Sequence, residues 1–371
     1  GQTFVAMRVF WPSKRFADSD LIPGGGAASA VVENDAATKH VLDALRSDSV
    51  VLGEDKPDPV RDAHIERAIE LLPKLESDPD ARREYVFILR SLLDPSAAHA
   101  DDASIEFFTA DPQKLFDELE GEVVAPPPAS AGGATSLGGG GASTDAGGAA
   151  GLGDLLKGAK AAARRLANFA TYYRMKARAG TVGSVGVASV LRRVREVRPE
   201  MPIHLIGHSF GGRLVTAAAH ALDPDTPKVT ISLLQAAFSH NGLSGGFGDD
   251  GQVGFFREVL SKRRASGPII ITHTKNDKAV GVAYPLASRI ARQVAAALGD
   301  RNDPYGGMGR NGAQNTDEAR GNEATLGLPG TEYSFEPGKV HNLEADLIRD
   351  HGDVGRIEVA YAVLCNAGAV G

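Results

Sequence analysis

Residues 203–212 read Ile-His-Leu-Ile-Gly-His-Ser-Phe-Gly-Gly, and they join a short apolar run to a segment of small residues at 213–221. A strand, a Gly-x-Ser-x-Gly turn and a helix in this order are typical of a nucleophile elbow. Such a turn presents a serine at the end of a buried strand. A side chain at Gly207 or Gly211 would crowd the turn, in which the serine itself takes a strained backbone conformation. The stretch therefore predicts Ser209 as a nucleophile.

The context of the pentapeptide, rather than the pentapeptide itself, supports this prediction. Glycine makes up 44 of the 371 residues, so a chance Gly-x-Ser-x-Gly is expected about 0.3 times. Residues 242–246, Gly-Leu-Ser-Gly-Gly, are a second match. No strand leads directly into Ser244, and the Gly/Asp-rich residues 247–251 cannot begin a helix. Only Ser209 has a strand before it and a helix after it.

The composition is that of an ordinary globular protein, 42% hydrophobic and 23% charged, long enough for one large α/β domain or two smaller ones. A net charge of −7 argues against a nucleic-acid partner. The single cysteine, Cys365, excludes an internal disulfide and fits a reducing, cytoplasmic setting. No run has the length of a membrane span. Residues 1–3 do not resemble a signal peptide, and we expect the chain to begin inside a longer protein.

The first half of the chain is predicted to be largely helical. Residues 4–11 form a strand candidate that Pro12 ends. Apolar stripes at helical spacing follow between 35 and 121, without strand patterns. We therefore expect a first core strand at 1–16 and a helical insertion at 17–124, interpreted either as a cap over the site or as a peripheral appendage.

Two further segments precede the elbow. Residues 125–151 are rich in Pro, Gly, Ala and Ser, which predicts a flexible linker. Residues 152–179 predict one long helix, within a segment taken as 152–181, with an apolar stripe and a basic face. We expect that basic face to be solvated. Peripheral contact with an anionic membrane is the alternative interpretation.

Strand and helix patterns alternate from residue 182 to the end of the chain. The predicted helices cover 182–197, 254–263, 282–298 and 355–364, and the predicted strands cover 202–206, 228–234, 268–273 and 339–345. Residues 300–330 are predicted to be a solvated loop. This alternation indicates an α/β fold, with a parallel sheet wrapped by helices.

From the elbow onward the sequence resembles the α/β-hydrolase superfamily, in particular its bacterial esterase- and lipase-like members. The resemblance covers about residues 182–371 and the first strand. It implies a mostly parallel sheet flanked by helices, with the helical insertion between the first strand and the elbow strand. It also implies a catalytic triad in the chain order Ser, Asp or Glu, His.

The resemblance places the acid and the base on particular loops. Asp277 follows the strand at 268–273, where the family carries its acid, and Asp249 and Asp250 are the competitors. His351 lies between the last strand and the last helix, where the family carries its general base, whereas His341 is better read as structural.

The remaining predicted site residues surround this triad. The N–H of Phe210 is expected to be one oxyanion-hole donor, and the second is expected on an upstream loop outside this chain. A flexible loop is favoured over an oxyanion role for the glycines at 24–26. His208, His240 and His273 are candidate pocket residues. Neither a cofactor nor a metal is expected.

The predicted function is cleavage of a small-molecule or lipid ester through an acyl-enzyme intermediate. An acyltransferase or a thioesterase with the same triad is an alternative. A non-catalytic hydrolase-like binding protein is another, although the presence of all three residue types in order argues against it. The oligomeric state and the acyl and head-group specificity are left open.

Overall fold

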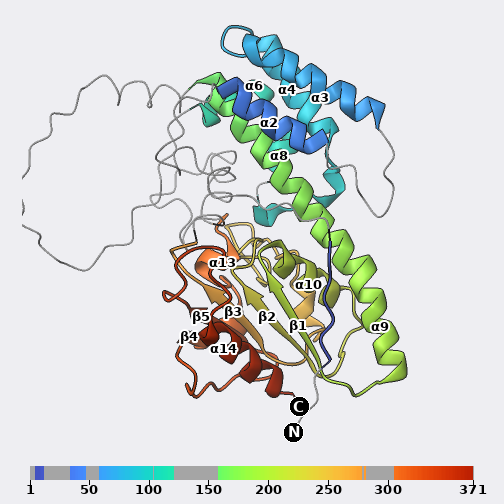
Figure 1. The fold of residues 1–371 in the computed structure, drawn as a ribbon, viewed down its shortest axis with the longest axis vertical. Coiled ribbons are helices and arrows are strands. Elements are labelled where there is room, and N and C mark those ends of the chain that lie inside the picture. Colours follow the sequence, from blue (N-terminus) through green and yellow to red (C-terminus); the bar gives the residue numbers. More distant parts are fainter. Residues whose placement is uncertain are drawn as a thin grey trace, which may run out of the picture.

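The computed structural model describes residues 5–11, 34–46, 58–102, 104–120, 158–277, 280 and 305–370. A parallel sheet of five strands in the order β1-β2-β3-β5-β4 lies at one end of the described molecule (Figure 1). The strands are β1 (Ile203–His208), β2 (Val229–Leu234), β3 (Ile269–His273), β4 (Glu323–Thr325) and β5 (Val340–Glu344). The α/β class and the parallel sheet predicted from the sequence are confirmed.

Helices cover both faces of the sheet. Ile269 and Ile271 of β3 belong to the larger apolar core, which the elbow helix α10 (Phe210–His220) shares. Ile270, pointing the opposite way, packs in a second cluster with Val359 of α14 (Ile357–Gly368). Side chains alternate between the faces of a strand, so apolar residues at successive positions require a layer on each side.

A separate group of helices forms its own apolar core at the other end of the molecule (Figure 1). Each of three of these helices begins with proline behind an aspartate whose carboxylate accepts a backbone N–H, a strong N-cap arrangement. The group comprises α2 (Asn34–Arg46), α3 (Pro59–Leu71), α4 (Pro79–Ser91), α5 (Ser104–Thr109) and α6 (Pro112–Leu119), with short 3-10 turns at Leu72–Lys74, Pro95–Ala97 and Ala100–Asp102. The helical character predicted for this region is confirmed.

One long helix connects the two ends of the molecule. α8 (Ala159–Thr181) continues through a π-helical turn, Val182–Val187, into α9 (Ala188–Val197), so the two helices predicted here are one. The π turn packs so closely against α10 that a side chain on Gly183 would collide with the carbonyl of Leu214. Within α9, Leu191 is buried whereas the neighbouring Val190 is exposed.

The prediction of a solvated basic face on α8 is wrong for three of its cations. Arg165, Lys176 and Arg178 are all more than nine-tenths buried. The helix packs against α2, α4 and α6 on one side and against α10 on another, so it is surrounded rather than laid on a surface. Those buried cations are not available to an anionic membrane.

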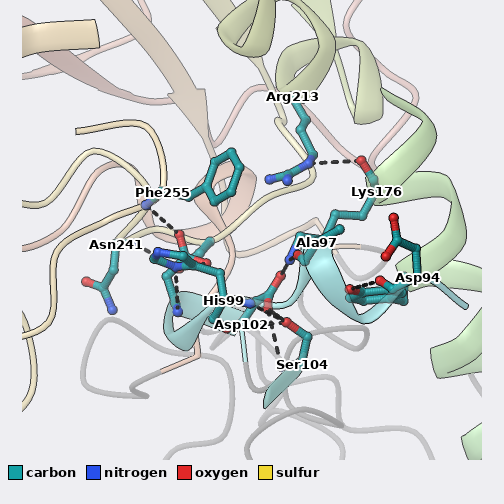
Figure 2. Close-up of polar contacts among 12 residues, drawn as sticks. Asp94, Ala97, His99, Asp102, Ser104, Lys176, Arg213, Asn241 and Phe255 are labelled. Carbon is teal, nitrogen blue, oxygen red and sulfur yellow. Dashed lines mark hydrogen bonds and ion pairs between the residues drawn. The ribbon is translucent and has the colours of Figure 1, made fainter. Parts of the chain in front are cut away.

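The buried Lys176 ends in a cluster of charged groups between the helical end and the elbow helix (Figure 2). Its ammonium pairs with Asp102, whose carboxylate also accepts the Ser104 hydroxyl at 2.5 Å. The guanidinium of Arg213, on α10, donates to the carbonyl of Lys176 at 3.0 Å. Burial lowers the pKa of Lys176, against the attraction of Asp102.

A second carboxylate extends this cluster toward the loop at 236–257. Asp101 pairs with His99 at 3.2 Å and accepts the backbone N–H of Phe255 at 3.2 Å. Burial alone would raise the pKa of Asp101, but the hydrogen bond from His99 and the charge of Lys176 hold it below its usual value. The cluster therefore ties the segment Ala100–Asp102 to α8, to α10 and to this loop.

Several predicted elements differ from the structure. The described residues 5–11 form no strand and expose Val5 and Phe10, although Trp11 packs against the sheet core. A strand needs a paired neighbour, and its apolar pattern alone does not supply one. The helix predicted at 254–263 is reduced to α11 (Glu258–Ser261). The loop predicted at 300–330 contains α13 (Met308–Asn311), a 3-10 turn (Asp317–Ala319) and β4.

The linker predicted at 125–151, the glycines at 24–26 and the helix predicted at 282–298 fall outside the described residues. Across the ranges that the structure describes, no helix is both long enough and apolar enough to cross a bilayer.

Candidate active site

Ser209 lies at a tight turn between β1 and α10, with φ 56° and ψ −128°. This is backbone that a residue with a Cβ rarely adopts. Three hydrogen bonds hold it: its N–H donates to the Leu234 carbonyl at 3.1 Å, and its own carbonyl accepts the N–H groups of Gly212 and Ala237 at 2.9 and 3.0 Å. The serine is thus fixed at the carboxyl end of β1, a strand whose residues alternate between buried and more exposed positions.

Only one of the two motif glycines is required by close packing. A side chain on Gly207 would collide with the backbone of Gly211, as predicted. The prediction for Gly211 is wrong, because a Cβ there would meet no atom of the described residues within 4 Å outside the backbone of its own helix. The second crowded position is Gly212, where a Cβ would lie 2.7 Å from that of Ala236. Gly212 therefore lets α10 begin directly against the residues that follow β2.

Asp277 and His351 are brought together from loops after β3 and β5. Nδ1 of His351 lies 2.9 Å from Oδ2 of Asp277, whose side chain is fully buried. The other carboxylate oxygen accepts the N–H of Val280 at 2.9 Å. A carboxylate only accepts hydrogen bonds, so Nδ1 carries the proton and Nε2 is left as a base. Asp249 and Asp250, the competing acids, lie exposed in a turn.

The base-bearing loop lies directly beside the elbow. Nε2 of His208, the residue before Ser209, donates to the carbonyl of His351 at 2.7 Å, and the two imidazole rings lie 4.8 Å apart. Burial, followed by the charge of His351, lowers the pKa of His208. The imidazole of His208 thus contacts both the backbone carbonyl and the imidazole ring of His351.

The two serines of the two Gly-x-Ser-x-Gly matches differ in their surroundings. Within the described ranges, the Ser209 hydroxyl makes no hydrogen bond and its side chain is half-buried. The Ser244 hydroxyl is buried, donates to the carbonyl of Asn315 at 2.7 Å and accepts the N–H of Gly246 at 3.0 Å. Ser244 caps a loop, which agrees with its exclusion on sequence grounds.

The other candidate pocket histidines do not join Ser209. His240 is buried and lies 3.1 Å from the amide of Asn311 on α13. His273 lines a polar cavity of about 370 Å³ beneath the loop at 311–320, together with Asn342 and Glu344. Neither Ser209 nor His351 lines that cavity.

Phe210 begins α10, and the N–H groups of a first helical turn point beyond the helix end rather than into it. That direction suits an oxyanion donor.

The structural interpretation of His341 agrees with its contact, since its Nε2 accepts the N–H of Glu336 at 3.0 Å. His204, inside β1, contacts the hydroxyls of Thr230 and Ser232 on β2, and burial lowers its pKa to about 4. Among the residues that the structure describes, no cluster of three or more His, Cys, Asp or Glu side chains could hold a metal ion.

Sequence reasoning named His208 as a pocket candidate but missed its contact with the His351 loop, and it missed Asn276 and a group of buried charges altogether. The contact of His208 with the His351 loop joins residues 143 positions apart, and Asn276 makes a similar contact across 72 positions. The burial of Asp102, Lys176 and Arg213 could not be predicted from the sequence. The pattern around a helical lysine is the same whether its side chain is exposed to solvent or buried in an ion pair. Comparison of the chain with family models, with curated proteins and with solved structures finds no match.

Proposed function

We propose that this protein is a serine hydrolase of the α/β-hydrolase type that cleaves carboxylic esters through an acyl-enzyme intermediate. The observation that carries the proposal is the pairing of the buried Asp277 with His351, whose loop is bound by His208 of the strained strand–turn–helix junction that presents Ser209. A nucleophile, a base and an acid that orients the base are the groups that acyl transfer requires.

Each residue has a stated role in the proposed reaction. Oγ of Ser209 attacks the ester carbonyl carbon while Nε2 of His351 accepts its proton. The N–H of Phe210 stabilises the oxyanion that forms. His351 then gives the proton to the departing alcohol, which leaves an acyl-Ser209 ester. Asp277 holds the imidazole in its Nδ1–H tautomer and stabilises the imidazolium.

Deacylation repeats these steps with water as the nucleophile. His351 takes a proton from water, which attacks the acyl carbon, and then returns the proton to Ser209 as the acid departs. The Oγ–Nε2 hydrogen bond is expected to form when substrate is bound, since such bonds are often long without it.

A fluorophosphonate probe and a p-nitrophenyl ester test this proposal. Wild type should be labelled and should release p-nitrophenol, whereas Ser209→Ala should do neither. Asp277→Asn should lower kcat by about 10⁴-fold, because the tautomer of His351 is no longer fixed.

The second motif supplies the matched control. Ser244→Ala removes the serine of the other Gly-x-Ser-x-Gly and should keep labelling and turnover. An unlabelled wild type, or equal labelling of Ser209→Ala, would refute the proposal. Product analysis with water against thiol or alcohol acceptors then separates hydrolysis from acyl transfer.

A further inference from the structure

Residues 345–354, the base loop, carry His351 between β5 and α14. Most of the loop lies on the surface, and only Ala345 and Ile348 are fully buried. Its first residue is tied to the sheet by the N–H of Ala345, which donates to the His273 carbonyl at 2.8 Å. Surface loops are mobile unless further contacts hold them, and a base must be placed to within a fraction of an ångström.

Thr274 and Arg356 contact carboxylates of the loop, and Asp277 contacts the imidazole of His351. Two further side chains from outside the loop donate to its backbone carbonyls. The amide of Asn276 donates to the carbonyl of Ile348 at 2.9 Å and lies 3.4 Å from that of Asp346. The imidazole of His208 donates to the carbonyl of His351 itself at 2.7 Å. Both donors therefore bind backbone carbonyls of the loop. Asn276 binds the carbonyl of Ile348, three residues before the base, and His208 binds the carbonyl of the base itself.

Each of these two donors is the chain neighbour of a residue of the proposed triad. His208 immediately precedes Ser209, and Asn276 immediately precedes Asp277. We propose that His208 and Asn276 are positioning residues that clamp the base loop. Through these two neighbours of Ser209 and Asp277, the position of His351 is fixed relative to both the nucleophile and the acid. The effect of the clamp on catalysis rests on the proposed function, whereas the contacts that form the clamp do not depend on it.

The position of the base loop is set by the strands that carry the two donors. His208 ends β1 and Asn276 follows β3, and both strands lie in one parallel sheet. A loop held from both strands is therefore restrained relative to Ser209 and to Asp277 at the same time. Losing one donor leaves the loop attached at Ala345 and at the other donor, so the effect should be on the placement of His351 rather than on folding.

Conservative and non-conservative variants separate the donor from the shape of each side chain. His208→Gln keeps an N–H at the Nε2 position, whereas His208→Met keeps bulk without a donor. Asn276→Leu keeps the shape of asparagine without its amide. Misplacing a catalytic group by about 1 Å costs on the order of 10²-fold. We expect kcat for the p-nitrophenyl ester to fall by that factor in His208→Met and Asn276→Leu, with KM unchanged and His208→Gln near wild type.

Two variants elsewhere are matched controls. His64 on α3 contacts the Ser91 hydroxyl at 3.1 Å, and Asn322 donates its amide to the Glu318 carbonyl at 2.9 Å. Both are half-buried and lie outside the base loop and its neighbours. His64→Met and Asn322→Leu should leave kcat and KM as in wild type.

A readout that does not need activity tests the clamp separately. The proton shared by His351 Nδ1 and Asp277 should give a low-field proton resonance in wild type and His208→Gln. In His208→Met, and more so in His208→Met/Asn276→Leu, the resonance should broaden or disappear, and amide exchange in 345–354 should accelerate. Unchanged resonance and exchange in the double variant, or failure of His208→Gln to restore them, would overturn the clamp. An unlabelled wild type that keeps the resonance would instead overturn the proposed function alone.

Discussion

Backbone strain at Ser209 is offset by its neighbours rather than by its own side chain. A residue held at such φ and ψ values costs about 1–3 kcal/mol, and strain of this kind is found at functional sites. Hydrogen bonds to Leu234 and Ala237, at the end of β2, hold the turn. The half-buried serine is thereby held at the carboxyl end of β1 without depending on a contact of its hydroxyl.

The two motif glycines should respond differently to alanine. Gly207→Ala places a Cβ against the backbone of Gly211 and should lower the free energy of unfolding by about 1–3 kcal/mol, the usual cost of overpacking. Gly211→Ala adds a Cβ that meets no described residue outside its own helix, and it lies in the first turn of α10. Stability should therefore be kept or should rise by up to about 1 kcal/mol. Urea denaturation of both variants measures the difference, and equal losses would contradict this account of the turn.

At the scale of elements, α8 is stabilised by burial on nearly all sides, and its charge at Lys176 is neutralised inside the protein. Desolvating a charge costs several kcal/mol unless a partner and hydrogen bonds compensate. Asp102 is that partner, and the carbonyl of Ala97 lies 3.5 Å from the ammonium. The charge pair therefore fixes the contact between α8 and the segment Ala100–Asp102 (Figure 2).

Removing one member of the pair should cost more than removing both. Asp102→Asn leaves the ammonium of Lys176 without its closest countercharge and should lower the free energy of unfolding by about 3–5 kcal/mol. Asp102→Asn/Lys176→Met removes both charges and should recover a large part of that loss. A double-mutant cycle in urea gives the coupling energy, and additive losses would show that the pair does not interact.

At the scale of the whole molecule, two apolar cores share one helix. Leu166 of α8 belongs to the helical core, whereas Met175, further along the same helix, belongs to the sheet core. Loss of packing in one core would remove the tertiary contacts of half of this shared helix, and most helical stability in proteins comes from such contacts. The two ends are therefore expected to unfold together.

Two probes on one variant test this coupling. Trp11, the single tryptophan, packs against the sheet core and reports on it by fluorescence, while far-UV circular dichroism reports mostly on helices. Leu166→Ala should cost about 2–5 kcal/mol and shift both transitions to the same lower denaturant concentration. A circular dichroism transition that separates from the fluorescence transition would show that the two cores unfold independently.

Local sequence patterns predicted the elements that depend on near neighbours. The helices around Leu42, Ile65, Tyr85 and Leu115, and four of the five strands that the structure describes, follow from apolar periodicity together with proline and glycine positions. The short strand β4 was missed because its three residues are all exposed and carry no alternation. Residues 5–11 have a strand-like composition but no pairing partner among the described strands, so composition misled there.

By itself, the sequence determined the turn at Ser209, because glycine at 207 and a strand before a helix are local requirements. Chain order, read through the family resemblance, also pointed to Asp277 and His351. Only the tertiary structure decided which carboxylate meets His351, that Lys176 is buried against Asp102, and that His208 and Asn276 hold the base loop. The physical reason is distance along the chain. These contacts join residues separated by about seventy positions or more, whose pairing depends on strand order in the sheet and leaves no periodic signal.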